Sequence, residues 1–166
     1  MVKYFVGIRL PRQFEEDCEF WRRKFGAPRT IAHITLIPPF EWESTEEDLL
    51  KLLGHETDSI RPFLVSGRGL GSFGKRVLFV NVELGADFKA AQQRLAHGLS
   101  QAGVPPERRP YRPHITLATR LWPEQFDRFW SEAAEFKPDY AFRCRCISLF
   151  RFGPQDGWQD RAKLRL

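Results

Sequence analysis

The sequence predicts an α+β fold built from two similar lobes, and three observations support this prediction. The tetrapeptide His-Ile-Thr-Leu occurs at residues 33–36 and again at residues 114–117. A strand-like run precedes each copy, and a tryptophan followed by an acidic, helix-like stretch comes after each copy. The order of elements is therefore the same in both halves, as an internal duplication would produce. We expect one domain over residues 1–166 made of two interleaved lobes, with repeats at about 1–76 and 77–166.

The first half reads as two strands that alternate with two helices. Residues 4–10 form a predicted strand, and the proline that follows suits the first turn of a helix over residues 11–25. A second strand over residues 32–37 should stop at the two prolines after it. The serine that opens residues 44–53 has capping-box spacing with a glutamate three residues on, which predicts a helix there.

The second half repeats this order after a hairpin. Residues 63–68 and 77–84 are aromatic or β-branched runs separated by several glycines, which is typical of a hairpin. Residues 88–102 carry an apolar stripe with helical spacing, residues 114–119 form a short strand, and a helix lies within residues 123–136. The chain closes with two predicted strands and the turn between them, at residues 140–152, 158–166 and 153–157.

Composition places the chain among globular proteins. It has 166 residues, of which 42% are apolar, and no apolar run approaches the roughly 20 residues of a membrane span. The first residues lack the long apolar stretch of a secretory signal, so we expect the protein not to be exported. The three cysteines, Cys18, Cys144 and Cys146, lack zinc-site spacing, and we expect them to be reduced. The chain is therefore expected to be a soluble, cytoplasmic monomer without membrane association or an obligate protein partner.

The net charge favours a phosphate-bearing partner. It is +5, and 19 arginines stand against 7 lysines. The planar guanidinium fork of arginine matches phosphate geometry. Such a charge permits a nucleic-acid or nucleotide partner.

The repeated tetrapeptide places two polar side chains on one face of each predicted strand. Side chains alternate between faces, so His33 and Thr35 point one way while the aliphatic residues anchor the other face in a core. The same holds for His114 and Thr116. If a pseudo-twofold relates the lobes, two histidines and two threonines surround one small cavity. His55 and His97 have no matching partner in the other half, and we expect them at the surface.

This set of groups suits acid-base chemistry at phosphorus. Histidine titrates near neutral pH, so one ring can accept a proton while its counterpart donates one. A phosphodiester needs both at once, and threonine hydroxyls can bind the non-bridging oxygens. Two histidines without carboxylate or thiolate partners make a poor zinc site. We therefore expect neither a metal nor another cofactor.

Two H-x-[ST]-x motifs half a chain apart resemble the signature of the 2H phosphoesterases. The chain is most similar to the bacterial branch known as RNA 2′,3′-cyclic phosphodiesterase or 2′-5′ RNA ligase, and residues 73–78 and 113–117 also resemble that branch. The resemblance implies a bilobal, pseudo-twofold duplicated α+β fold. Each lobe would be an antiparallel sheet with helices on its outer face, and an active-site cleft would lie between the lobes.

The resemblance also implies an activity and its residues. It implies metal-independent opening of the 2′,3′-cyclic phosphates of RNA ends or nucleotides to 2′-phosphates. His33 and His114 would be the acid and the base, in an order that the sequence leaves open, and Thr35 and Thr116 would hold the phosphate. Further candidates for substrate binding, each also compatible with an ordinary surface or core role, are Arg76, Tyr111, Arg120 and Phe40.

Two other functions remain compatible with the sequence. The same histidines could catalyse reversible 2′-5′ joining of RNA ends, because acid and base exchange roles in the reverse reaction. Alternatively, the chain could be a non-catalytic module that binds a nucleotide or RNA through arginine and threonine, with an affinity that falls as salt rises.

Overall fold

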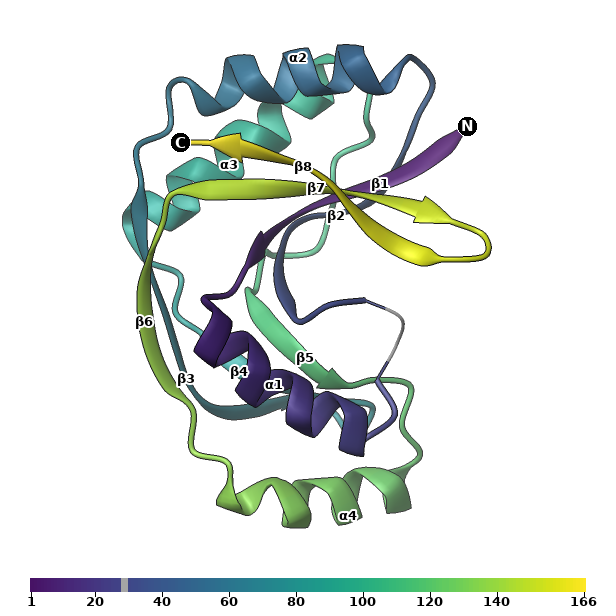
Figure 1. The fold of residues 1–166 in the computed structure, drawn as a ribbon, viewed down its shortest axis with the longest axis vertical. Coiled ribbons are helices and arrows are strands. Elements are labelled where there is room, and N and C mark those ends of the chain that lie inside the picture. Colours follow the sequence, from purple (N-terminus) through teal and green to yellow (C-terminus); the bar gives the residue numbers. More distant parts are fainter. Residues whose placement is uncertain (28–29) are drawn as a thin grey trace.

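The computed structural model describes residues 1–27 and 30–166 and alternates strands with helices along the chain (Figure 1). Its elements, in chain order, are β1 (Val2–Arg9), α1 (Arg12–Lys24), β2 (His33–Trp42), α2 (Glu46–Thr57), β3 (Phe63–Phe73), β4 (Val77–Val82), α3 (Ala86–Gln101), β5 (His114–Ala118), α4 (Pro123–Glu132), the short 3₁₀ helix η1 (Ala133–Glu135), β6 (Asp139–Cys144), β7 (Cys146–Gly153) and β8 (Gly157–Arg165).

The strands form two four-stranded antiparallel sheets, and the predicted two-lobed α+β class is confirmed. The strand orders are β2-β1-β7-β8 in the first sheet and β5-β4-β3-β6 in the second. Helices α2 and α3 lie beside the first sheet, and α1 and α4 lie beside the second (Figure 1). The strands that carry the repeated tetrapeptide, β2 and β5, are both sheet edges, and they contact each other across the two sheets.

One apolar core unites the two sheets. Its cluster of buried residues includes Phe14 from α1, Phe63 from β3, Phe88 from α3 and Leu149 from β7. Helix α1 contacts β5, whereas α3 contacts β2. The first helix of each half therefore packs against the motif strand of the other half, which couples the lobes. Among the helices of the described residues, none is long and apolar enough to cross a membrane.

The prediction that Pro38 and Pro39 end the second strand is wrong, because β2 continues through them to Trp42. The register with β1 pairs Ile37 with Val6 and Phe40 with Tyr4, so the two prolines fall in an irregular stretch of the ladder. Proline lacks the N–H that a regular ladder needs, and an edge strand with a bulge tolerates that loss. The edge position of β2 was not evident from the sequence.

The predicted strand over residues 140–152 is divided at Arg145. Its first part, β6, is the far edge of the second sheet, and its second part, β7, lies inside the first sheet. Alternating apolar residues predict extended backbone, but they carry no information about which sheet the backbone joins. This segment therefore passes from one lobe to the other.

Helix α2 is capped by Thr45 and not by the predicted Ser44. The Thr45 hydroxyl accepts a hydrogen bond from the Asp48 backbone N–H at 3.1 Å. The Ser44 hydroxyl instead donates to the Asp48 carboxylate at 2.6 Å. The cap therefore sits one residue later than the capping-box spacing predicted, and the helix continues to Thr57.

Candidate active site

The alternation predicted for the two motif strands is confirmed. In β2 the motif histidine and threonine are partly exposed, while Ile34 and Leu36 are fully buried. In β5 the motif histidine and threonine are likewise partly exposed, while Ile115 and Leu117 are fully buried. Each strand therefore anchors itself in the core through one face and presents an imidazole and a hydroxyl on the other.

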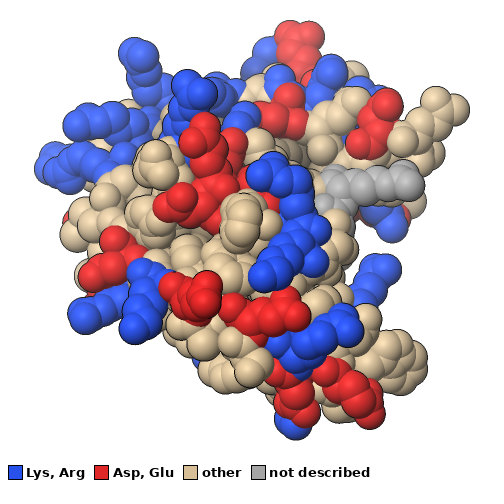
Figure 2. Space-filling view, turned by 60° about the horizontal axis from the view of Figure 1, so that its bottom comes forward, with Lys and Arg blue, Asp and Glu red and all other residues tan. Residues whose placement is uncertain are grey.

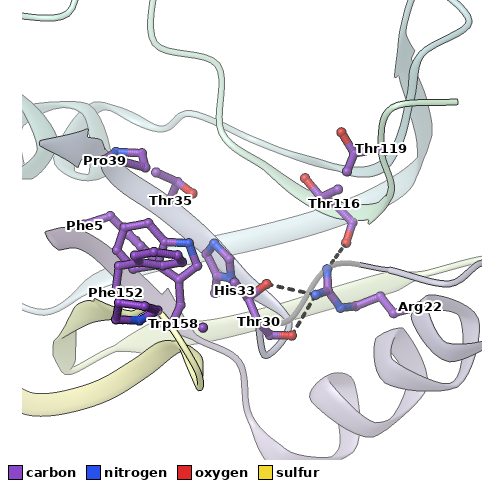
Figure 3. Close-up of a pocket in the computed structure, with 12 residues that line it drawn as sticks. Phe5, Arg22, Thr30, His33, Thr35, Pro39, Thr116, Thr119, Phe152 and Trp158 are labelled. Carbon is purple, nitrogen blue, oxygen red and sulfur yellow. Dashed lines mark hydrogen bonds between the residues drawn. The ribbon is translucent and has the colours of Figure 1, made fainter. Parts of the chain in front are cut away.

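A cavity of about 450 Å³ lies where the two sheets meet (Figure 3). Three of the four motif side chains, those of His33, Thr35 and Thr116, line it, and His114 lies beyond its lining against Phe73 and Phe79. The remaining lining residues come from β1, α1, β2, the β7–β8 hairpin and the segments beside the motif strands: Phe5, Arg22, Thr30, Pro39, Thr119, Phe152, Pro154, Gly157 and Trp158.

The two histidines are held in the same way. In each case the ring Nδ1 lies within hydrogen-bond distance of the backbone carbonyl two residues earlier, at 2.7 Å for His33 with Ile31 and 2.8 Å for His114 with Arg112. A carbonyl can only accept, so Nδ1 carries the proton and donates it. The neutral ring therefore keeps the lone pair of Nε2 free to accept a proton.

Aromatic rings pack against both imidazoles. The His33 ring lies 4.8 Å from the ring of Phe5 and 5.7 Å from that of Phe150. The His114 ring lies 5.0 Å from the rings of both Phe73 and Phe79. These apolar walls restrict the rotation of the rings and remove water from their faces.

Burial lowers the pKa of both histidines. The pKa of His33 falls to about 4, chiefly through desolvation, with smaller contributions from the positive charges of Arg22 and His114. The pKa of His114 is lowered mainly by desolvation; the hydrogen bond to the Arg112 carbonyl opposes this shift, and the charge of Arg112 adds to it. His33 is therefore neutral at pH 7.

Arg22 is a site residue that sequence reasoning missed. Its side chain is only 2% exposed and belongs to helix α1. One guanidinium nitrogen donates to the Thr116 carbonyl at 2.5 Å, and the other donates to the carbonyl and the hydroxyl of Thr30 (Figure 3). Its Nε lies 3.2 Å from the Glu19 carboxylate, outside hydrogen-bond geometry.

A signal for Arg22 was present in the sequence. The apolar face of α1 runs through Phe14, Cys18, Trp21 and Phe25, and position 22 falls on that face. A charged residue on an apolar stripe must find polar partners inside the protein, because an unpaired buried charge is costly. The pattern therefore predicts a buried arginine, although it does not predict that its partners lie in the site.

Tyr111 supports β2 from outside the cavity. Its hydroxyl donates to the Thr35 carbonyl at 2.8 Å, and its ring stacks on Phe88 at 6.0 Å. The expectation that the Tyr111 ring lines the groove is therefore wrong, because the segment that carries it packs against helix α3. Phe40 is also placed elsewhere: it is 8% exposed, packs near Tyr4, and lines a second cavity of about 410 Å³ beside α3.

Arg76 and Arg120 lie beside the cavity and do not line it. Arg76 is exposed in the turn between β3 and β4, and its carbonyl accepts a hydrogen bond from the Leu121 backbone N–H at 3.1 Å. Arg120 is exposed with a φ of 56°. Thr119, which precedes it, is the residue of that segment that lines the cavity.

Two further cavity residues form an aromatic ledge that the sequence analysis did not identify. The rings of Phe152 and Trp158 lie 5.3 Å apart across the β7–β8 hairpin, and Trp158 meets the Phe5 ring edge-on at 4.8 Å. Figure 3 shows these three rings on one side of His33 and Arg22 on the other. Phe152 is 41% exposed, so the aromatic ledge has a free ring surface.

The remaining histidines and the cysteines do not line the cavity. His55 and His97 are exposed, as predicted. All three cysteines are free thiols, and burial raises the pKa of Cys18 and Cys144 to about 12. Within residues 1–27 and 30–166, no three His, Cys, Asp or Glu side chains gather as a metal site would need.

Two sheets that each present a His-x-Thr edge strand to a common cavity define the 2H phosphoesterase class. The model of the 2′-5′ RNA ligase superfamily matches residues 10–156. The chain therefore belongs to the 2′-5′ RNA ligase superfamily. No curated protein sequence matches it.

Solved structures with the same fold cover nearly the whole chain. Escherichia coli LigT complexed with 3′-AMP is 20% identical, with a TM-score of 0.73 over 99% of this chain and 98% of that chain. TT0787 of Thermus thermophilus is 24% identical, with a TM-score of 0.70 over 99% of this chain and 97% of that chain. At these identities the likeness establishes the fold.

Proposed function

We propose that this chain is a metal-independent phosphodiesterase that opens the 2′,3′-cyclic phosphates of RNA ends or nucleotides to 2′-phosphates. The observation that carries the proposal is the matched pair of imidazoles, each held through Nδ1 by a backbone carbonyl. Within residues 1–27 and 30–166, neither Nε2 has a hydrogen-bond partner. A binding module has no need of two proton-transfer groups with matched orientation. An acid-base mechanism at phosphorus needs both.

His33 is the base in this proposal. Its low pKa leaves Nε2 unprotonated at pH 7, so it can take a proton from the attacking water. The water oxygen bonds to phosphorus as the bond from phosphorus to O3′ breaks. His114 must first take up a proton at Nε2; in this cationic form it gives the Nε2 proton to the departing O3′, and the products are a 2′-phosphate and a free 3′-hydroxyl. Exchange of the two protons with solvent restores the starting state.

Hydroxyls and a buried cation stabilise the charge on the phosphate. Thr35 and Thr116 line the cavity and can donate to the non-bridging oxygens. Arg22 lines the same cavity from below Thr116, and its charge is poorly screened because its side chain is buried. It occupies the side of the cavity opposite the aromatic ledge, which suits a phosphate on one side and a base on the other.

A cavity with a cation on one side and aromatic rings on the other supports a nucleotide as the ligand. The aromatic ledge offers the apolar surface on which a nucleobase stacks. Structures of E. coli LigT have been solved with 3′-AMP, ATP and NADP+. These ligands share an adenine nucleotide, and we expect the cavity of this chain to take the same class of ligand.

The test is hydrolysis of a nucleoside 2′,3′-cyclic phosphate by purified protein in excess chelator, followed by phosphorus NMR. The wild-type protein should release the 2′-phosphate. His33→Ala and His114→Ala should each reduce turnover by about a hundredfold or more, since each removes one proton-transfer group. His97→Ala, at an exposed position, is the matched control. Full activity in both site variants would overturn the proposal.

The superfamily match favours a second activity in the same site. Joining a 2′,3′-cyclic phosphate end to a 5′-hydroxyl end is the reverse of opening a 2′-5′ bond, so the two histidines exchange roles. Adding an excess of RNA that carries a 5′-hydroxyl to the same assay should then yield a 2′-5′ linked product. Hydrolysis that is unaffected by such RNA, with no joined product, would limit the chain to the phosphodiesterase reaction.

A further inference from the structure

Helix α1 holds the segment that leads into His33. The Glu19 carboxylate accepts a hydrogen bond from the Ala32 backbone N–H at 2.5 Å. Three residues further along the helix, Arg22 donates to the carbonyl and the hydroxyl of Thr30 (Figure 3). Ala32 is fully buried, so its N–H needs an acceptor inside the protein. Glu19 is that acceptor, and the proposed chemistry assigns it no role.

One peptide group connects Glu19 with the imidazole of His33. The Ile31 carbonyl and the Ala32 N–H are the two polar ends of the same planar peptide unit. Among the described residues every peptide bond is trans, so these two groups point in opposite directions. The Ile31 carbonyl accepts the Nδ1 proton of His33 at 2.7 Å. A rigid peptide group therefore has the carboxylate at one end and the imidazole at the other.

The carboxylate strengthens the Ile31 carbonyl as an acceptor. Hydrogen bonds in a chain polarise one another inside a protein, and a bond to a charged acceptor is stronger than one between neutral groups. Desolvation lowers the pKa of His33, and the hydrogen bond to the Ile31 carbonyl raises it. A stronger acceptor at Ile31 therefore makes Nε2 of His33 a better proton acceptor and restricts the orientation of the ring.

The other motif histidine has the same carbonyl contact without a carboxylate behind it. The Nδ1 proton of His114 goes to the Arg112 carbonyl at 2.8 Å. The peptide unit of that carbonyl ends at Pro113, and proline has no backbone N–H. No acceptor can polarise this peptide unit through an N–H. The two imidazoles therefore have matched contacts at Nδ1 but differ at the far end of the peptide group.

Glu19 differs from an ordinary surface acid. Acidic and basic side chains are interspersed on the face of the molecule that Figure 2 shows. The Glu19 side chain is only 23% exposed, and its carboxylate lies 3.2 Å from Nε of the buried Arg22. Glu16, one turn earlier on α1, has a 57% exposed side chain and pairs with Arg12 at 2.9 Å. Glu16 therefore offers a comparison for the charge of this helix alone.

We propose that Glu19 is a positioning residue for the general base and acts on His33 through the peptide group between Ile31 and Ala32. This inference rests on the proposed function for the chemistry of His33. The base gains a positive charge as it takes a proton, in a place where burial disfavours that charge, and the carboxylate offsets part of this cost. The acid loses its charge in the same step, so His114 needs no such support.

The first test is NMR at neutral pH, which does not depend on activity. Glu19→Gln keeps a side-chain oxygen that can accept from the Ala32 N–H, but it removes the charge. The Nδ1 proton of His33 should therefore move upfield, because its hydrogen bond weakens, while the Nδ1 proton of His114 should stay in place. The matched control Glu16→Gln removes a charge from the same helix and should leave both signals unchanged.

Steady-state kinetics on a nucleoside 2′,3′-cyclic phosphate provide the second test. Glu19→Gln should lower kcat by about threefold to tenfold, because the base is less effective. KM should stay nearly the same, since Glu19 does not line the cavity. Glu16→Gln should match the wild type in both constants.

The two tests separate this inference from the proposed function. An unchanged His33 signal in Glu19→Gln would overturn the inference, and so would an unchanged kcat if the wild-type protein is active. If no cyclic phosphate is hydrolysed but the His33 signal moves, the proposed function fails while the connection between Glu19 and His33 stands.

Discussion

Two side chains near the site hold the backbone of the motif strands in place by hydrogen bonds. The carbonyl of Thr35 accepts from Tyr111, and the carbonyl of Thr116 accepts from Arg22. Each donor comes from the other half of the chain relative to its acceptor. Because β2 and β5 are sheet edges, their outward carbonyls have no neighbouring strand and must be satisfied in this way. The same bonds fix the positions of the two threonine hydroxyls.

Replacing Arg22 tests this support. Arg22→Met should lower the free energy of unfolding by about 1–3 kcal/mol, because the buried carbonyls of Thr30 and Thr116 lose their donor. It should also raise the pKa of His33, since one nearby positive charge disappears. Urea unfolding and NMR titration of the His33 ring measure the two effects.

Arg22→Lys provides the control for charge. It keeps the cation but not the planar fork, so the pKa of His33 should stay low while the unfolding free energy still falls. An unchanged His33 pKa in Arg22→Met would show that the charge of Arg22 does not reach the site.

The low pKa of His33 also predicts how the free energy of unfolding depends on pH. The pKa of His33 is about 4 in the folded protein and near 6.5 in the unfolded chain. Between these pH values His33 is protonated mainly in the unfolded state, so the unfolded state binds more protons. Stability should therefore decrease as pH falls through this window, and the His33 contribution should approach about 1.4 kcal/mol per pH unit. Above pH 6.5 that contribution should be constant.

The measurement is urea unfolding at several pH values for the wild type and for His33→Asn. Asparagine cannot take up the proton, so the variant should lose part of the pH dependence between pH 6.5 and 4. Parallel stability curves for the two proteins would contradict the low pKa. The exposed histidine variant His97→Asn should follow the wild type.

At the scale of elements, the neighbours of each motif strand determine the surroundings of its histidine. Against β2, the pairing of β1 with β7 stacks Phe5 on Phe150 at 4.4 Å, and both rings touch His33. Against β5, the pairing of β4 with β3 places Phe79 opposite Gly71. The missing side chain at position 71 leaves the space that the Phe79 ring fills.

Gly71→Ala should therefore disturb His114. A Cβ at this position would lie 2.5 Å from the Asn81 side-chain oxygen and 2.7 Å from the Phe79 ring. Such overpacking typically costs about 1–3 kcal/mol, and displacement of the Phe79 ring should lower turnover because this ring packs against His114. Thermal unfolding and steady-state kinetics on a cyclic mononucleotide measure both.

Gly54→Ala is the matched control. Gly54 lies within α2 with open space where a Cβ would stand, so alanine should stabilise the helix by about 0.5–1 kcal/mol without any change in turnover. A Gly71→Ala variant that is as stable and active as Gly54→Ala would show that β3 and β4 can separate without affecting the site.

At the scale of the whole molecule, the duplicated halves do not correspond to the sheets. The first sheet combines β1 and β2 with β7 and β8 from the end of the chain, and the second sheet takes β3 from the first half. Each half alone would leave β-strand edges and apolar faces uncovered. We propose on this basis that the two repeats fold only together, as one domain.

Separate expression of residues 1–76 and 77–166 tests the proposal. Each fragment should lack a cooperative thermal transition, because neither can complete the first sheet, and mixing the two should restore one. Circular dichroism during heating provides the measurement. A cooperative transition in either fragment alone would mean that a half-chain is an independent domain.

The sequence was sufficient to predict the two lobes, most helices and strands, and the presentation of the motif side chains on one strand face. These properties follow from local periodicity and from a repeat, both of which are readable along the chain. The continuation of β2 through Pro38 and Pro39 and the passage of residues 140–152 between sheets depend on which strand pairs with which. Pairing partners are distant in sequence and leave no local pattern.

The same distinction applies to the site. His33, His114 and the two threonines were identified from the sequence because they recur with equal spacing, whereas Arg22 and Trp158 reach the cavity only through the packing of α1 and of the β7–β8 hairpin. Chemical type and strand face are local properties of a sequence. The low pKa of His33 and the hydrogen bond from Arg22 to the Thr116 carbonyl arise from groups far apart in the chain, so only the tertiary structure decides them.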